Sequence, residues 1–257
     1  MITSHSNPKV KLVRALARKK ERYAAQQFVV EGVRLIEEAL DARVAPSFVL
    51  HTANVEDDAR ACALLERLRA ATPEVFAVSD EVMQDIATTE TPQGIVAVVP
   101  FVELPLPAQP QFVLILDAVR DPGNIGTILR SARAAGVDVV FCAHGTADPY
   151  NEKVVRAAMG AHFAVPLRVA SWEMIADAVR HVARVYLADA RGDVVYTRAD
   201  WTRPVALIVG GEAEGAGDNA KKIATARVSI PMRGGAESLN AAMAATLLLF
   251  EATRFVV

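Results

Sequence analysis

The sequence has little of the chemistry that disulfide-bonded or zinc-bound proteins need. Its 257 residues include two cysteines, Cys62 and Cys142, which lie far apart. Cysteine and histidine do not recur at the spacing of a zinc site either. We therefore expect no disulfide framework and no bound metal, and we interpret both cysteines as small core residues.

Long apolar runs are also missing. No run approaches the roughly 18 apolar residues that a membrane-spanning helix requires, and the first residues lack the apolar segment of a secretion signal. Internal repeats and low-complexity tracts are absent, whereas 52% of the residues are hydrophobic. The chain can therefore build a proper core. We expect a cytoplasmic protein with no membrane partner.

A strong net charge is the third absence, since the formal charge is only −2. This balance argues against a nucleic-acid partner, but the charges are unevenly distributed. Residues 9–22 carry seven lysines and arginines against the single acid Glu21. By itself such a segment is most simply interpreted as a solvated helix face, with contact to RNA as the alternative.

Proline divides the chain into two parts. Residues 102–110, VELPLPAQP, hold three prolines, which deny a sheet its backbone donors. We therefore predict an extended linker at 101–110, between a domain at 1–100 and a domain at 111–257. Strand-like and helix-like segments alternate in both domains, which predicts a small α/β layer structure followed by a second α/β domain.

Several strands of the second domain are apolar at consecutive positions, including FVLILD at 112–117 and VALIVG at 205–210. Such runs suit a parallel sheet that is buried on both faces. In an open sheet of this kind, ligands bind at the carboxyl ends of the strands. We therefore expect the chemistry in the loops after these two strands and after ARVSIP at 226–231.

The first of these loops, DPGN, leads into a helix expected at 124–135. Its apolar stripe includes Ile125 and Ile128, whereas Arg130 and Arg133 lie away from that stripe. Asn124 is the expected N-cap. The simpler interpretation is a capped helix with solvated arginines; the functional one is that Asn124 and Arg130 face one cleft.

The other two loops are rich in glycine. The turn after the strand at 205–210 lacks the G-x-G-x-x-G pattern of a dinucleotide fold, which argues against a nicotinamide-dependent oxidoreductase. Glu212 lies in this turn, where a carboxylate could accept a hydrogen bond from a ribose hydroxyl. The third loop enters a helix at 238–254 that is apolar nearly all round, and which must therefore be buried against the sheet or against another subunit. Ser238 is its expected N-cap, which leaves Asn240 without an explanation.

Together the three loops resemble the SpoU/TrmH branch of the SPOUT RNA methyltransferases, which methylate ribose 2′-oxygens with S-adenosylmethionine. The family's Asn-x-Gly-x-x-x-Arg motif is present at 124–130, its Gly-x-Glu-x-x-Gly turn at 210–215, and its Pro-Met and Ser-Leu-Asn motifs at 231–232 and 238–240. Where the family often has a serine, this chain has Ala242. The N-terminal part, with VVEG and TPQGIVAVV, resembles the family's substrate-binding domain.

The resemblance implies a parallel-sheet SPOUT domain with a deep trefoil knot, preceded by a substrate-binding α/β domain, and a homodimer formed through the C-terminal domain. It implies catalytic roles for Asn124, Arg130, Glu212, Ser238 and Asn240. It implies S-adenosylmethionine contacts, which leave S-adenosylhomocysteine as product, at Gly210, Gly211, Glu212, Ile230, Met232, Ser238 and Leu239. In this context we expect RNA contacts at Lys9, Lys11, Arg14, Arg18, Arg22 and Arg133.

Two questions stay open at this stage. Arg130 is either a general base or a cationic anchor for phosphate and the emerging oxyanion; free arginine keeps its proton near neutral pH, which favours the anchor. The appended domain favours 23S ribosomal RNA as substrate over tRNA, the alternatives being a tRNA 2′-O-methyltransferase or a non-catalytic RNA-binding protein. The sequence names neither the nucleotide nor the purpose, housekeeping or antibiotic resistance.

Overall fold

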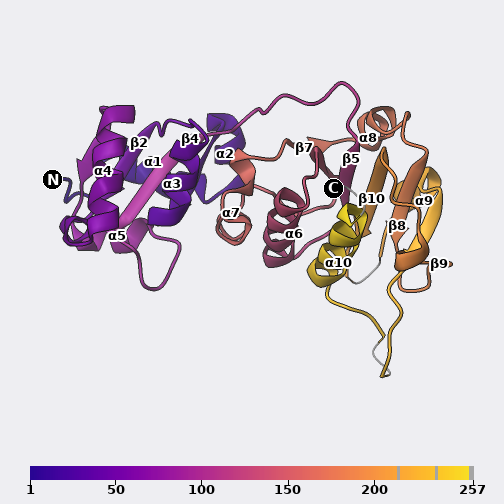
Figure 1. Ribbon diagram of the computed structural model, residues 1–257. Helices are drawn as coiled ribbons and strands as arrows, with labels where there is room; N and C mark the ends of the chain where they lie inside the picture. The colour runs from indigo at the N-terminus through magenta and orange to yellow at the C-terminus, as the bar shows by residue number, and fades with distance from the viewer. Residues whose placement is uncertain (213–214, 235–236, 255–257) are drawn as a thin grey trace. The chain divides into compact units, whose positions relative to one another are not determined.

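The computed structural model describes residues 1–212, 215–234 and 237–254, and it divides the chain into two compact units. The first unit comprises Met1–Val102 and Tyr150–Phe163, and the second comprises Glu103–Pro149 and Ala164–Val257 (Figure 1). No helix among the described residues is both long and apolar enough to cross a lipid bilayer.

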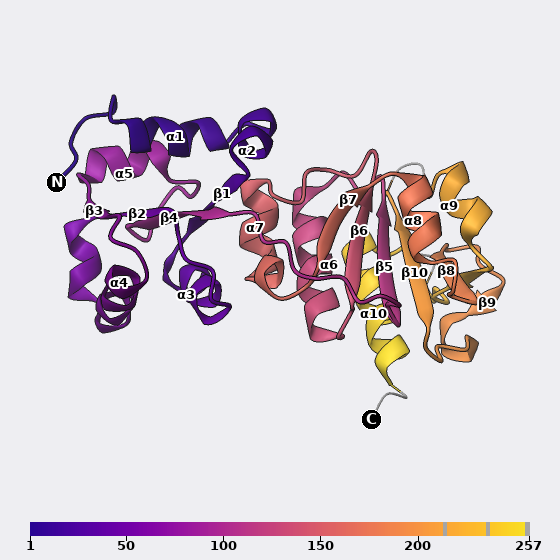
Figure 2. The same ribbon diagram turned by 90° about the horizontal axis from the view of Figure 1, so that it is seen from above.

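The first unit is built on a four-stranded sheet in the order β1-β4-β2-β3. Strand β4 is antiparallel to both β1 and β2, and β2 is parallel to β3. Helices α1 and α5 lie on one face, and α3 and α4 lie on the other (Figure 2). The strands are β1 (Gln27–Glu31), β2 (Phe48–His51), β3 (Val75–Ala77) and β4 (Ile95–Pro100). The helices are α1 (Pro8–Leu16), α2 (Lys19–Ala25), α3 (Val33–Asp41), η1 (Ala53–Asp57), α4 (Ala59–Ala71), α5 (Asp80–Ile86), α7 (Glu152–Ala158) and η2 (Ala161–Phe163).

The basic segment at 9–22 forms two helices, α1 and α2. As a capping side chain before proline predicts, Asn7 accepts a hydrogen bond from the Lys9 backbone (2.9 Å), and Pro8 opens α1. The apolar side chains of α1 are buried against the sheet, which leaves most of its basic residues outside.

The segment 150–163 packs with the first unit, although the linker alone would assign it to the C-terminal domain. The Tyr150 ring stacks on Phe101 with 3.9 Å between ring centroids, and it lies 5.3 Å from Phe28 of β1. Arg156 of α7 donates to the Thr88 carbonyl oxygen (3.2 Å). These are long-range contacts between aromatic rings and side chains, which no local sequence pattern reveals.

The second unit is a seven-stranded, wholly parallel sheet in the order β7-β6-β5-β10-β8-β11-β9. Every residue of β5 and β6 is buried, as consecutive apolar residues predict. The short edge strands β7 and β9 escaped sequence analysis, because edge strands need few apolar residues. The strands are β5 (Phe112–Asp117), β6 (Val139–Ala143), β7 (Leu167–Ala170), β8 (Arg184–Ala188), β9 (Val194–Val195), β10 (Val205–Gly210) and β11 (Ala226–Ser229).

Helices cover both faces of this sheet. Helices α6 and α10 pack together on one face, where the Ser131 and Thr246 hydroxyls are 2.7 Å apart, and α8 and α9 cover the other (Figures 1 and 2). The helices are α6 (Pro122–Ala134), α8 (Trp172–Ala178), η3 (Tyr196–Arg198), α9 (Asp218–Ile223) and α10 (Ala241–Thr253).

Two predicted helix caps are wrong. Helix α6 begins at Pro122, and the Asp121 carboxylate caps it by accepting from the Asn124 backbone (2.7 Å). Helix α10 begins at Ala241, so that Asn240 is its N-cap and Ser238 lies before the helix. Proline prefers the first helical position, which moves the cap of α6 to the preceding residue. The first correction leaves the Asn124 side chain available to the expected site, and the second gives Asn240 a structural role.

Candidate active site

A cavity of about 680 Å³ lies at the carboxyl ends of β8, β10 and β11 in the second unit. The turn after β10, the segment after β11 and the start of α10 all contribute to its wall. All seven residues expected to contact a cofactor line this cavity, namely Gly210, Gly211, Glu212, Ile230, Met232, Ser238 and Leu239. The structure thus brings together three segments that are up to 30 residues apart in sequence.

The end of β10 and the turn that follows are packed too closely for side chains at Gly210 and Gly211. A Cβ at Gly211 would lie 2.3 Å from the Ala118 carbonyl oxygen, and one at Gly210 would lie 2.5 Å from the Ala216 nitrogen. The buried Asp117 carboxylate at the end of β5 accepts a hydrogen bond from the Gly217 backbone (2.7 Å). Asp117 therefore holds this turn in place, a role that sequence analysis missed.

Three polar side chains connect the loops. The Asn124 Nδ2 donates to Glu212 Oε1 (2.5 Å), and the Asn240 Nδ2 donates to Asn124 Oδ1 (2.9 Å). A carboxylate can only accept, so the bond to Glu212 fixes which way the Asn124 amide faces. Asn240 also caps α10, where its Oδ1 accepts from the Ala242 (2.9 Å) and Met243 (3.3 Å) backbones. We call this chain, Asn240 to Asn124 to Glu212, the amide relay.

Arg130 stands apart from the amide relay. It is exposed on α6, it does not line the cavity, and no polar side chain among the described residues pairs with it. The expectation that Asn124 and Arg130 face one cleft is therefore not met within this chain. Six residues along a helix correspond to about 9 Å of rise and to side chains about 120° apart. Arg133 is exposed in the last turn of the same helix.

The basic residues at 9–22 differ in what they do. Arg22 is 3% exposed, and its Nη1 donates to the carbonyl oxygens of Leu16 and Ala17 (both 2.7 Å). It therefore satisfies backbone groups at the end of α1 and is not available to RNA, contrary to expectation. Lys9 forms an ion pair with Glu74 and lies over the Phe48 ring, 4.9 Å from its centroid, so its ammonium is also engaged within the protein.

The other three basic side chains of this segment that are expected to contact RNA are exposed, namely Lys11, Arg14 and Arg18. Arg14 lies 3.5 Å from Asp85 and Arg18 lies 3.7 Å from Glu21, and the side chains of both arginines are more than half exposed. Lys11 is exposed on α1. Ion pairs at such positions are weak and can be exchanged for another anion. These three side chains are therefore accessible to a phosphate.

The loop after β8 also reaches the cavity, which sequence analysis did not anticipate. Asp189, Arg191 and Arg227 contribute to the wall, and Arg227 pairs with Asp189 (3.6 Å) and with Asp193 (3.0 Å). The hydrogen bond to Asp193 and its charge raise the pKa of Arg227 above its ordinary value. The sequence does carry a signal for this loop, because residues 184–190, RVYLADA, predict a strand whose carboxyl end lies at the same edge of the sheet.

Both cysteines lie outside this site. Cys142 is 1% exposed on β6, as expected for a core residue, and burial raises the pKa of its thiol to about 12. Cys62 is half-buried on α4. Within the described ranges, no group of histidine, cysteine, aspartate and glutamate side chains is arranged to hold a metal ion.

The chain is similar to known proteins over nearly its whole length. Residues 111–250 match the SpoU rRNA Methylase family, and residues 7–97 match the MRM3-like substrate binding domain. The 23S rRNA (guanosine(2553)-2′-O)-methyltransferase RlmP of Bacillus subtilis is 36% identical over 250 residues, which cover 97% of each protein. The 23S rRNA (uridine(2479)-2′-O)-methyltransferase of Streptomyces viridochromogenes is 35% identical over 93% of this chain and 86% of that protein.

A solved structure is similar as well. The AdoMet-bound rRNA methyltransferase from Sinorhizobium meliloti superposes with a TM-score of 0.86 at 34% identity, covering 100% of this chain and 98% of that one.

Proposed function

The chain belongs to the SpoU rRNA methylase family, and from this membership we propose that it transfers a methyl group from S-adenosylmethionine to a ribose 2′-hydroxyl of 23S ribosomal RNA. One observation carries the proposal: the amide relay connects Glu212 and Asn240, which both line the 680 Å³ cavity, through Asn124 at the start of α6. The relatives named above act on a guanosine and on a uridine of the same RNA, which supports the RNA class and leaves the base open.

The cavity fits the cofactor in size and in lining. Its volume of about 680 Å³ lies within the range of small-molecule sites, and its wall combines backbone groups of Gly210 and Gly211 with the apolar side chains of Ile230, Met232 and Leu239. When bound there, S-adenosylmethionine supplies a methyl group on a positively charged sulfur. We assign its binding to these residues together with Ser238.

The amide relay is suited to positioning. A neutral ribose hydroxyl is a weak nucleophile, so it gains from groups that orient it and that stabilise negative charge on its oxygen. The bond to Asn124 occupies Glu212 Oε1 and leaves Oε2 of the same carboxylate to accept from a hydroxyl. Correct orientation alone can supply much of the rate of such a reaction. We therefore assign positioning roles to Asn124, Glu212, Ser238 and Asn240.

Arg130 acts in this proposal as a cation rather than as a base. It is exposed, and no carboxylate of the described residues neutralises it. A guanidinium in such a place keeps its charge and can hold the phosphate next to the target ribose while it stabilises the emerging oxyanion. Lys11, Arg14, Arg18 and Arg133 are assigned to further contacts with the RNA backbone, whose phosphates dominate affinity.

A second copy of the chain is part of the proposal, because α10 presents an uncovered apolar stripe. Met243, Leu247 and Phe250 recur at i, i+4 and i+7 on this helix and are 63%, 44% and 47% exposed. A stripe of this kind is typical of a protein interface. We propose a homodimer through α10, a cytoplasmic location, and the deep trefoil knot that the family resemblance implies.

The proposal is tested with purified protein, radiolabelled S-adenosylmethionine, and transcripts of 23S rRNA and tRNA. We expect 2′-O-methylation of 23S rRNA, and we expect Arg130→Ala to abolish transfer while S-adenosylmethionine still binds. Transfer to tRNA alone would support a tRNA 2′-O-methyltransferase. RNA binding without transfer would support a non-catalytic RNA-binding protein. Full turnover by Arg130→Ala would remove the role assigned to that residue. Mapping 2′-O-methyl groups in cells with and without the gene identifies the nucleotide.

A further inference from the structure

A second cavity, of about 610 Å³, lies within the first unit and has no part in the site described above. It is bordered by the starts of α3, α4 and α5, by η1, and by the turn before β4. Val33, Val55 and Met83 form an apolar part of its lining, and Val55 and Met83 are themselves largely buried. The volume is far larger than a water or an ion needs and is typical of a site for a small organic group.

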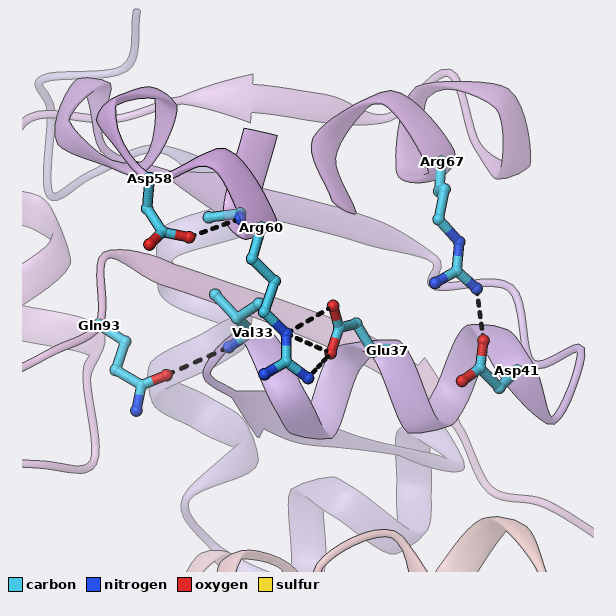
Figure 3. Close-up of polar contacts among 8 residues, drawn as sticks. Val33, Glu37, Asp41, Asp58, Arg60, Arg67 and Gln93 are labelled. Carbon is cyan, nitrogen blue, oxygen red and sulfur yellow. Dashed lines mark hydrogen bonds and ion pairs between the residues drawn. The ribbon is translucent and has the colours of Figure 1, made fainter. Parts of the chain in front are cut away.

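Three exposed residues with side-chain amides, Asn54, Gln84 and Gln93, also line the cavity. Gln93 accepts a hydrogen bond from the Val33 backbone through Oε1 (3.2 Å), as Figure 3 shows, which leaves its Nε2 as a donor. Within the described part of the chain, neither that Nε2 nor the amides of Asn54 and Gln84 have a protein hydrogen-bond partner. Each amide offers both donors and an acceptor. The lining therefore presents several unused hydrogen-bonding groups around an apolar surface.

Two glycines allow the Gln93 turn to pack closely against its neighbours. Gly32 has a φ of +95°, and a Cβ there would lie 2.7 Å from Gln93 Oε1. Gly94 has a φ of +74°, and a Cβ there would lie 2.5 Å from the Thr52 hydroxyl oxygen. Both positions favour glycine on conformation and on space. The absence of side chains at Gly32 and Gly94 thus lets the Gln93 amide lie against the start of α3.

Arg60 belongs to this lining, and its side chain is about half exposed. Its Nε lies 3.0 Å from each Glu37 oxygen and its Nη2 lies 2.5 Å from Oε2, so the carboxylate of α3 holds the guanidinium of α4 along one edge. Figure 3 shows the guanidinium next to Val33, which Gln93 reaches from the other side. A planar guanidinium whose edge is occupied still offers its face for stacking.

The charges on the lining balance. Arg34 and Arg60 are matched by Asp58 and Asp80, and Asp58 also caps α4 by accepting from the Ala61 backbone (2.8 Å). A balanced lining does not favour a bare phosphate. It suits an uncharged group that has hydrogen-bond donors and acceptors. Arg34 is exposed and has no ion-pair partner within the described residues, so it can meet an anion attached to such a group.

We propose that this cavity binds one nucleobase of the substrate RNA, turned out of its stack, with Arg60 against its face and Asn54, Gln84 and Gln93 along its edge. Sequence-specific proteins read RNA mostly through unpaired bases of this kind, which stack on rings or guanidinium planes and are hydrogen-bonded at their edges. The inference rests on the proposed function, because it takes RNA as the substrate. It adds a base-reading site that is separate from the methyl-transfer loops.

The structure supplies a matched control for the test. Arg67 of α4 pairs with Asp41 of α3 (2.5 Å), so both arginines join the same two helices, but only Arg60 lines the cavity (Figure 3). Affinity is measured with in vitro transcripts that tile 23S rRNA. Arg60→Ala and the double change Asn54→Ala with Gln84→Ala should each weaken binding of the preferred transcript about tenfold. Arg67→Ala should stay within about twofold of wild type, the scale of a weak surface pair.

A double-mutant cycle then locates the base. Single abasic sites are scanned through a synthetic RNA of the preferred sequence. The abasic site at the bound nucleotide should cost the wild type about tenfold in affinity and cost Arg60→Ala clearly less, since in that variant the base has already lost its stacking partner. Equal losses for both proteins at every position, or a loss for Arg67→Ala as large as for Arg60→Ala, would overturn the proposal.

These measurements keep the two proposals apart. Binding that depends on Arg60, by a protein that transfers no methyl group, would support the base-reading cavity and reject the methyltransferase function. Normal methylation of 23S rRNA by an Arg60→Ala variant with wild-type RNA affinity would support the methyltransferase function and reject the base-reading cavity. S-adenosylmethionine affinity, measured by calorimetry, should be the same in all of these variants, because the cavity that we assign to it lies in the other unit.

Discussion

Replacing Asn240 separates its two tasks, capping α10 and connecting the amide relay. Asn240→Ala removes both. Losing an N-cap costs about 1 kcal/mol of unfolding free energy. Losing the exposed hydrogen bond to Asn124 costs about 0.5 kcal/mol more. The sum, roughly 1.5 kcal/mol, corresponds to a drop in melting temperature of about 3–6 °C for a domain of this size.

Asn240→Asp keeps the cap of α10 and breaks the amide relay. A carboxylate caps a helix as well as an amide does, so the melting temperature should stay within about 1 °C of wild type. It cannot donate, however, so the single NH₂ of Asn124 must face either the introduced carboxylate or Glu212, and the other acceptor loses its partner. We expect methyl transfer to fall about 10- to 100-fold, the effect of a misplaced group near the reacting atoms.

The assay pairs thermal unfolding with initial rates of methyl transfer at saturating RNA. Ser131→Ala is the control, because Ser131 also joins α6 to α10, through Thr246 (2.7 Å), but lies outside the relay. It should lower stability slightly and leave the rate unchanged. Full activity in Asn240→Asp would refute the relay. A melting temperature as low as that of Asn240→Ala would refute the capping argument.

Three further predictions concern parts of the structure outside the relay. Arg22→Ala should lower the free energy of unfolding by about 2 kcal/mol in urea denaturation, because two carbonyl oxygens lose a buried cationic donor, whereas Arg14→Ala should cost under about 0.5 kcal/mol; similar losses would contradict the structural role of Arg22. Burial raises the pKa of the Cys142 thiol to about 12 from 9.0, so its contribution to stability is complete below about pH 9 and is lost as the pH rises from there towards 12. At about pH 8 iodoacetamide should therefore spare it until the protein unfolds, and rapid labelling of the native protein would argue against the burial. Leu247→Glu should convert the proposed dimer to a monomer in light scattering, and an unchanged mass would place any interface elsewhere.

Local patterns predicted the elements well and their ends less well. The consecutive apolar residues of β5 and β10 predicted a buried parallel sheet, because two covered faces demand them at every position. The caps were harder, since several residues near each helix start can accept a backbone hydrogen bond. Ser238 and Asn240 are both plausible caps in the sequence. The cap is the residue directly before the first helical residue, and the structure begins α10 at Ala241, after Asn240.

Side chains that look alike in sequence proved to have different environments. Arg18 and Arg22 lie four residues apart in one basic run, yet Arg18 is exposed and Arg22 is buried against the end of α1. The break between α1 and α2 makes this difference, and charge patterning cannot reveal it. The cavity of the first unit is a similar case, because its lining comes from several short segments that share no motif.

By itself, the sequence determined the two α/β parts, the parallel sheet and the family, because periodicity and the three motifs are local properties of the chain. Only the tertiary structure decided that Asn124, Glu212 and Asn240 bond to one another, that Arg130 stands away from them, and that Arg22 is buried. Those outcomes depend on how distant segments pack, since hydrogen-bond partners and burial are set by neighbours in space rather than in sequence.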